Sequence, residues 1–105
     1  MNKMDSTEEQ RRIRLILDGK TGEYAYFVNT YSERVLDFVS RLVDNGSDAE
    51  ELAQDAFVKA FRSLRTFDGR FSFLTWVCCI AVRVSLSTEA ARQAARGVRT
   101  ADRQL

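Results

Sequence analysis

The chain has 105 residues, of which 45% are hydrophobic and 30% are charged, and its formal net charge is +1. It contains no histidine, and its two cysteines are adjacent, so the commonest general base, the commonest metal ligand, a disulfide framework and a CxxC redox motif are all excluded. No glycine-rich phosphate loop is present, so the sequence favours a protein that is not an enzyme and needs no cofactor; an enzyme working with carboxylates alone is the remaining catalytic alternative.

The scarcity of turn-forming residues points to the fold class. The chain has no proline and only five glycines, whereas an all-β domain of this length would need many turns. An all-α fold is therefore predicted. No apolar run approaches the roughly 20 residues of a membrane span. The N-terminus is acidic and polar where a signal peptide would be apolar, so a cytoplasmic protein is expected.

Charge is distributed unevenly along the chain. Residues 1–58 contain 7 Lys and Arg against 12 Asp and Glu, whereas residues 59–105 contain 9 against 3. Opposite fields in the two halves suggest two different partners, with a polyanion as the partner of the basic half. The alternative is ordinary surface charge that is segregated by chance.

The first two helices are predicted over residues 6–18 and 22–43. Ser6 and Glu9 have the spacing of a capping box at the start of the first helix, and Gly19 lies just beyond its end. The second helix ends at the "DNGS" stretch and shows apolar residues at three-and-four spacing. These are Tyr24, Phe27, Val28, Tyr31, Val35, Phe38, Val39 and Leu42.

A third helix is predicted over residues 48–66, with Ser47 and Glu50 as a second capping-box pair. Its two faces differ in character, as a spacing of about 100° per residue requires of an amphipathic helix. The inner face consists of Leu52, Ala53, Ala56, Phe57, Ala60 and Leu64. The opposite stripe consists of Glu51, Gln54, Asp55, Val58 and Arg62.

A fourth helix is predicted to start after Ser72, a suitable N-cap. Phe73, Val77, Ile80, Ala81 and Val84 form its core stripe, and Thr75, Trp76, Cys79 and Arg83 lie along one flank. The expected organisation is a disordered start over 1–5, a compact three-helix bundle with a short additional N-terminal helix over 6–86, and a frayed or disordered tail over 87–105, whose Ala, Arg and Gln do not require burial.

The segment between the third and fourth helices reads "RTFDGRFSFLTW" over residues 65–76, which is unusually aromatic and basic for a loop. Phe67 and Phe73 are predicted to hold it against the core. It is harder to assign Arg70, Phe71 and Ser72 to the protein interior. Either the loop folds inward, or it presents these groups to a partner.

Residues 48–81 contain a series of motifs: the acidic "DAEEL" start, "QD", "F" and "KAFR" of the third helix, then "FDG", "F", "TWV" and "IA". In order and without gaps, they resemble the core-binding and promoter-melting segment of bacterial extracytoplasmic-function (ECF) sigma factors. With weaker similarity upstream the resemblance covers about residues 8–86. It implies the all-α region 2 domain of that family.

The resemblance implies a first partner, core RNA polymerase. In sigma factors the matching face of the third helix docks on the clamp helices of the largest polymerase subunit. An anti-sigma factor is a further candidate partner. Without the resemblance, this face of the third helix would be interpreted as an ordinary solvent-exposed surface. The residues implied to bind polymerase are Asp48, Glu51, Gln54, Asp55, Val58 and Arg62.

The second implied partner is promoter DNA, above all the non-template single strand of the minus-ten element. A base taken out of its stack needs a stacking surface and hydrogen-bond donors, and aromatic and basic groups at a helix start provide both. Trp76 is either a core residue or a contact, or it serves both roles. The implied DNA-binding residues are Arg65, Arg70, Phe71, Ser72, Thr75, Trp76, Cys79 and Arg83.

Two departures from the family pattern open an alternative. Relatives usually have a basic residue at the position of Cys79 and often Asn at that of Arg83, and the linker and second helix-turn-helix domain do not follow. The alternative is a truncated sigma-like interaction protein that binds polymerase or an anti-sigma factor without initiating transcription. Cys78 is expected to be a small hydrophobic filler, with a thiol redox sensor as the alternative.

Overall fold

The computed structural model describes the backbone of residues 3–43 and 45–104 and the side chains of residues 7–43 and 45–88. Within these ranges every regular element is a helix, and the all-α prediction is confirmed. The elements are α1 (Lys3–Leu17), η1 (Thr21–Glu23), α2 (Tyr24–Val39), α3 (Gly46–Arg62), η2 (Leu64–Thr66) and α4 (Phe73–Gln104).

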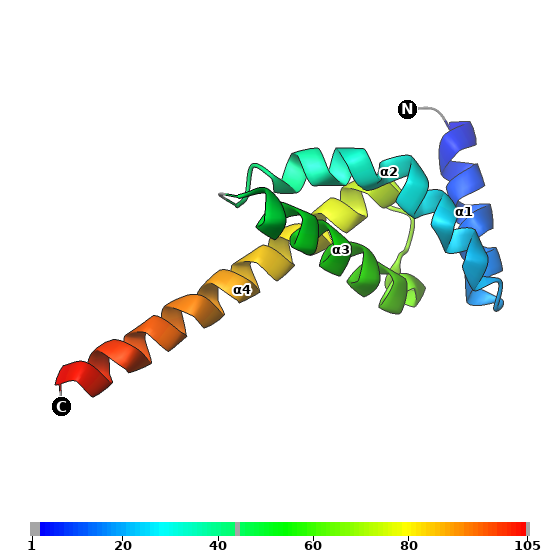
Figure 1. Cartoon of the computed structure of the whole chain (residues 1–105). Coiled ribbons are helices and arrows are strands. Elements are labelled where there is room, and N and C mark those ends of the chain that lie inside the picture. Colours follow the sequence, from blue (N-terminus) through cyan, green and yellow to red (C-terminus); the bar gives the residue numbers. More distant parts are fainter. Residues whose placement is uncertain (1–2, 44, 105) are drawn as a thin grey trace.

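Three helices form the body of the molecule. Helix α3 packs mainly against α4, and α2 packs on both of them. Helix α1 lies beside α2 and also contacts η2, at the end of the bundle opposite to the point where α4 leaves it (Figure 1). Because α4 is much longer than the others, its second half extends away from the bundle as a rod (Figure 1).

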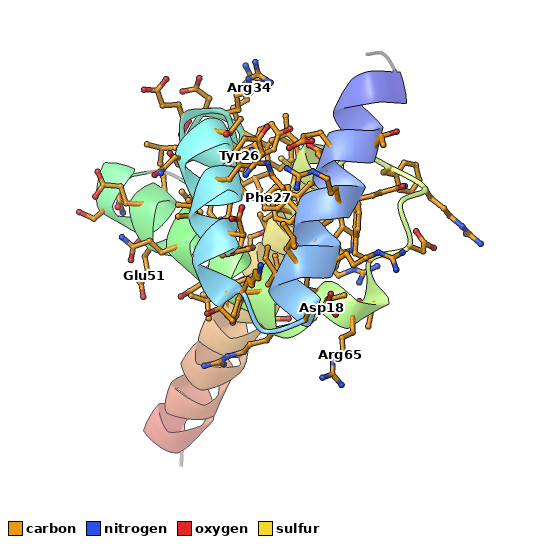
Figure 2. All side chains as sticks on the ribbon, turned by 90° about the vertical axis from the view of Figure 1, so that its right-hand side faces the viewer. Asp18, Tyr26, Phe27, Arg34, Glu51 and Arg65 are labelled. Carbon is orange, nitrogen blue, oxygen red and sulfur yellow. The ribbon has the colours of Figure 1, made fainter. Side chains whose placement is uncertain are left out.

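The core confirms most of the predicted apolar faces. All six residues of the predicted inner face of the third helix are buried. On α2, Phe27, Tyr31, Val35 and Val39 are buried, whereas Leu42 lies beyond the helix and is exposed. In Figure 2, Phe27 faces the interior behind α1, as expected for a ring with no exposed surface.

Phe73, the first residue of α4, is the centre of an aromatic cluster. Its ring is fully buried and lies 4.4 Å, centroid to centroid, from that of Phe27. The rings of Tyr24, Tyr31, Phe67 and Trp76 surround it at 5.9 to 6.3 Å. Rings at such separations attract beyond the area that they bury. The start of α4 is thereby fixed to α2 and to the preceding loop.

The helix starts differ from the predicted capping boxes. Helix α1 begins at Lys3, so Ser6 lies inside it. Helix α3 is capped by Asn45, whose side-chain oxygen accepts from the Asp48 N–H at 2.8 Å while its amide donates to the Asp48 carboxylate at 2.9 Å. Ser47 is therefore inside the helix. Asn is as good an N-cap as Ser, and here it stands earlier in the chain.

Two predicted helix boundaries are confirmed, whereas the ends predicted at residues 43 and 66 lie four residues beyond the observed ends at Val39 and Arg62. Gly19, with φ of 109°, follows α1 as predicted, and the Lys20 and Gly19 amides close back on Leu15 and Ile16. This is a Schellman arrangement, which favours glycine because of its left-handed conformation. Ser72 caps α4 as predicted, since its hydroxyl accepts from the Thr75 N–H at 3.2 Å.

The α4 backbone is helical to Gln104, beyond Leu86. Alanine and arginine favour helix even where nothing requires burial, which accounts for the continuous helix. The side chains of residues 89–105 lie outside the described set, and the division of the chain at residue 86 stays a prediction. Among the helices that the structure describes, none is long and apolar enough to serve as a membrane span.

Candidate polymerase and nucleic-acid interfaces

The outer stripe of α3, defined as Glu51, Gln54, Asp55, Val58 and Arg62, is exposed along its whole length. Val58 keeps 47% of its surface in solvent, which is unusual for an aliphatic side chain in the middle of a helix. Glu51 points away from the bundle in Figure 2. The stripe thus offers an apolar centre between charged ends, a suitable composition for docking against another helix.

At its acidic end the stripe borders an open groove of about 290 Å³. Asp48, Glu51 and Asp55 line one side of the groove, and Val84 and Leu86 of α4 line the other. The helical pattern predicted Val84 in the core stripe of α4 and assigned no role to Leu86. Val84 and Leu86 reach this groove only because α4 packs across α3. A sequence feature that could have indicated this position is Leu86 itself, a large apolar residue in a polar stretch.

The basic end of the stripe belongs to a second groove. Arg62 and Arg65 line it together with Leu17 of α1 and Phe61, both partly exposed, and its volume is about 440 Å³. Arg65 was grouped with the aromatic loop in the sequence. The structure instead places it on η2 beside Arg62, and Figure 2 shows it pointing away from the bundle.

The aromatic loop, defined as residues 68–72, is fixed at both ends by rings. Before it, Phe67 is half-buried, with its centroid 5.0 Å from that of Trp76. After it, Phe73 is fully buried. Both rings hold the loop against the core, as the sequence analysis predicted. Between these anchors the loop turns at Gly69, whose φ of 78° favours glycine.

The tip of the loop presents its side chains to solvent. Phe71 is 62% exposed, and the Arg70 side chain is 80% exposed. Arg70 forms an ion pair with Asp68 at 3.3 Å, and its backbone N–H donates to the same carboxylate at 3.0 Å. An ion pair this exposed contributes little stability, so the guanidinium can exchange Asp68 for another anion at low cost.

The start of α4 continues this surface. Ser72 donates from its hydroxyl to the Thr75 hydroxyl at 3.1 Å, and Thr75 is exposed. Thr75, Cys79 and Arg83, at intervals of four residues, lie along one face of the helix and are all exposed. Trp76 is half-buried between this face and the aromatic cluster, in agreement with the dual position expected for it.

The two cysteines have different surroundings. Cys79 is exposed, whereas Cys78 is half-buried against the core. Burial raises the pKa of the Cys78 thiol, and the neighbouring Cys79 adds to the effect. A thiol that resists ionisation is a poor nucleophile, which agrees with the expected filler role of Cys78.

The capping-box role that the sequence predicted for Glu9 is wrong. Glu9, predicted as half of a capping box in α1, is instead buried, with 4% of its surface exposed. Its carboxylate accepts hydrogen bonds from the Phe73 N–H at 3.1 Å and from the Tyr31 hydroxyl. A glutamate serves both in a capping box of its own helix and as a cap of a distant helix. The spacing of Ser6 and Glu9 in the sequence therefore does not distinguish the two roles.

The arrangement is suited to binding. One surface carries exposed acidic, aliphatic and amide groups on a helix, and the other carries an exposed ring, a guanidinium and hydroxyls at a helix start. Within the described residues no group of three or more Cys, Asp or Glu side chains could hold a metal ion.

Comparison with known proteins assigns the family. Residues 27–97 match the Sigma-70 region 2 family, and the chain belongs to it. Curated relatives are sigma factors from bacteria. The RNA polymerase sigma-H factor of Pseudomonas aeruginosa is 30% identical over 95 residues, which are 90% of this chain and 47% of that protein.

Two further relatives carry the ECF designation. The ECF RNA polymerase sigma-E factor of Escherichia coli K12 is 34% identical, and the ECF sigma factor SigW of Bacillus subtilis is 29% identical, each over 77 residues. These 77 residues are 73% of this chain but only 40% and 41% of the two relatives. The chain therefore spans less than half the length of the curated relatives that it matches.

A solved structure agrees in fold as well as in sequence. It is the NMR structure of an engineered region 2 of sigmaE in complex with GTAAAA, with a TM-score of 0.70 and 29% identity. The match covers 89% of this chain and 95% of that one. The resemblance to ECF sigma factors inferred from the sequence is confirmed.

Proposed function

We propose that this chain is the part of an ECF-type sigma factor that binds core RNA polymerase and recognises and helps to open the minus-ten promoter element. In this role it carries out no chemistry of its own and needs no cofactor. The observation that carries the proposal is the exposure of Arg70 and Phe71 between two anchored rings, Phe67 and Phe73.

The exposed outer stripe of α3 supports the polymerase part of the proposal. Helix-on-helix docking requires a central apolar contact and polar groups that set the register, and Val58 stands between Gln54, Asp55 and Arg62. The clamp helices of the largest polymerase subunit are the proposed partner. An anti-sigma factor competing for the same face is a further candidate.

The aromatic loop supports the DNA part. Phe71 offers a ring on which an unstacked base can pack, and Arg70 and the hydroxyls of Ser72 and Thr75 are polar groups close by in the chain. Stacking of one base on an aromatic side chain contributes about 1–3 kcal/mol, comparable to the cost of unpairing that base. The sigmaE region 2 of similar fold was solved with GTAAAA.

A single-strand binding assay tests the DNA part. Phe71→Ala should weaken binding to a fluorescent single-stranded oligonucleotide containing the minus-ten element by about 1–3 kcal/mol, because the stacking surface is lost. Binding to the corresponding duplex should change less. Phe71→Leu, which keeps bulk without a ring, should behave like Phe71→Ala. Arg70→Ala should also affect the single strand more than the duplex.

The control for Arg70 is Arg34→Ala, since Arg34 is exposed on α2 and points away from the bundle in Figure 2. It should leave the preference for single strands unchanged. Equal losses on single-stranded and duplex DNA for Arg70→Ala and Phe71→Ala would contradict base capture.

A second assay tests docking on core polymerase. Asp55→Lys should weaken the complex by about tenfold, equivalent to about 1.4 kcal/mol, because it reverses a charge on the docking face. Gln54→Ala should weaken it less. Glu33→Lys reverses a charge on the exposed side of α2 and serves as the control. Unchanged polymerase binding by both α3 variants, with helicity retained, would contradict the assignment of this face.

Run-off transcription separates initiation from binding alone. With core polymerase and a template whose minus-ten region is already unpaired, an initiating domain produces transcript. The alternative, an interaction protein that occupies the polymerase or an anti-sigma factor, would give no transcript and would inhibit a complete sigma factor added in competition.

A further inference from the structure

Two consecutive residues of α1 lie close to the aromatic loop: Gln10 lies against Gly69, and Glu9 contacts Phe73, the residue that follows the loop. Glu9 is the one charged or polar residue that is buried among the described side chains. Such a carboxylate requires partners, because burial removes its hydration. Its partners are the Phe73 N–H and the Tyr31 hydroxyl, which come from α4 and α2.

The bond to Phe73 places Glu9 at the N-terminus of α4. The first amides of a helix have no partner within the helix, and the positive end of its dipole attracts a carboxylate. Ser72 serves the Thr75 amide, and Glu9 serves the Phe73 amide from a different helix, 64 positions away in the chain. Glu9 therefore completes the cap of α4 and ties α1 to the C-terminal end of the loop.

The adjacent residue, Gln10, lies beneath the turn of the loop. A Cβ atom added at Gly69 would come within 2.7 Å of the Gln10 side-chain nitrogen, so the backbone of the loop runs directly against α1 at this point. The same turn of α1 thus lies against Gly69 and accepts a hydrogen bond from Phe73. Between them stand Arg70 and Phe71, the two exposed side chains of the loop tip.

We propose that Glu9 and Gln10 of α1 are positioning residues for single-strand recognition, which set the place and direction of Arg70 and Phe71 without touching DNA. This inference rests on the proposed function of the loop. Helix α1 is in turn fastened to α2, because Arg12 pairs with Glu23 at 3.0 Å and lies 3.8 Å from the centre of the Tyr26 ring. The position of the loop therefore depends on the docking of α1.

The test compares two substitutions at Glu9 in the same chain. Glu9→Leu fills the space but removes the acceptor for the Phe73 N–H, whereas Glu9→Gln keeps an acceptor oxygen and loses only the charge. Asp18→Asn, which removes a negative charge from the exposed surface directly after the same helix, is the matched control. Each variant is measured for single-strand affinity, core-polymerase affinity and hydrogen exchange of the Phe73 amide.

Glu9→Leu should lower single-strand affinity by about tenfold and the protection of the Phe73 amide by a similar factor, while polymerase affinity stays within about twofold. Glu9→Gln should stay within about threefold of the parent chain in all three measurements, and Asp18→Asn should equal the parent chain. Loss of Phe73 protection in Glu9→Leu with unchanged single-strand affinity would overturn the proposal. A parallel loss of polymerase binding would indicate general unfolding of Glu9→Leu, and the proposal is then decided by a second variant.

Gln10→Ala keeps the proposal testable if Glu9→Leu does not fold. Gln10 is exposed, so its truncation should not affect the core, and it should lower single-strand affinity about threefold with no change in polymerase affinity. Unchanged affinity would remove Gln10 from the proposal. Phe71→Ala is measured in parallel. If it weakens single-strand binding and the α1 variants do not, only this inference is wrong; if Phe71→Ala has no effect, the proposed function of the loop is wrong.

Discussion

At the scale of single residues, side chains that are close in the sequence have different degrees of burial. Phe71 and Phe73 are two positions apart, yet the first is largely exposed and the second is completely buried. Sequence pattern anticipated this difference, because Phe73 falls on the core stripe of α4 and Phe71 precedes the helix. Arg65 lies on η2 and lines a groove with Arg62, and its predicted role in DNA binding stays a prediction.

Cys79 gives a prediction at this scale. It is exposed on the same face of α4 as Thr75 and Arg83. Cys79→Arg should strengthen single-strand DNA binding slightly. It should also steepen the dependence of log affinity on log salt by about 0.7, the value for one added phosphate contact on a single strand.

Titration of the oligonucleotide at several salt concentrations measures both quantities. Cys79→Ser, which changes the side chain without adding charge, is the control and should leave the slope unaltered. An unchanged slope in Cys79→Arg would show that this position does not face DNA.

At the scale of helices, the type and approximate extent of each element follow from the sequence, but the caps of α1 and α3 do not. Periodicity over α2 and α3 identifies the buried faces because burial repeats with every turn. A cap depends on one hydrogen bond, and several nearby residues can form it. Asn45 and Ser47 are both good N-caps, and the choice between them depends on where the chain leaves the turn after α2.

The cap of α3 is tested by a pair of substitutions. Asn45→Ala should lower the free energy of unfolding by about 1 kcal/mol, because the Asp48 amide loses its acceptor. Ser47→Ala should have no destabilising effect, since Ser47 lies inside the helix and alanine is the better helix former. Urea denaturation followed by circular dichroism measures both. A larger loss in the free energy of unfolding for Ser47→Ala than for Asn45→Ala would favour the predicted capping box of Ser47 and Glu50 over the Asn45 cap.

At the scale of the whole molecule, hydrogen bonds from tyrosine hydroxyls link the helices in addition to apolar packing. The Tyr24 hydroxyl donates to the Phe57 carbonyl of α3 at 2.6 Å, and that of Tyr31 donates to Glu9 of α1. Such long-range contacts are the part of the fold that single-sequence patterns do not reveal. Burial raises the pKa of Tyr24, and burial together with the bond to Glu9 raises the pKa of Tyr31.

These raised pKa values predict a loss of stability in alkali. The folded state favours protonated tyrosine, so the contribution is complete below the ordinary tyrosine pKa of about 10. Above it the unfolded chain ionises first, and each tyrosine lowers the free energy of unfolding by up to about 1.4 kcal/mol per pH unit. Urea midpoints should therefore fall between pH 10 and about pH 11.5, and Tyr24→Phe and Tyr31→Phe should each flatten the fall. A midpoint independent of pH over this range would contradict the assignment.

The two rings that hold the aromatic loop have a kinetic consequence. With Phe67 and Phe73 fixed in the core, only five residues separate the anchored positions, and little conformational entropy is left to lose when a nucleotide binds. A preorganised segment keeps its ligand longer, so variants that loosen either anchor should release DNA faster while encountering it at nearly the same rate.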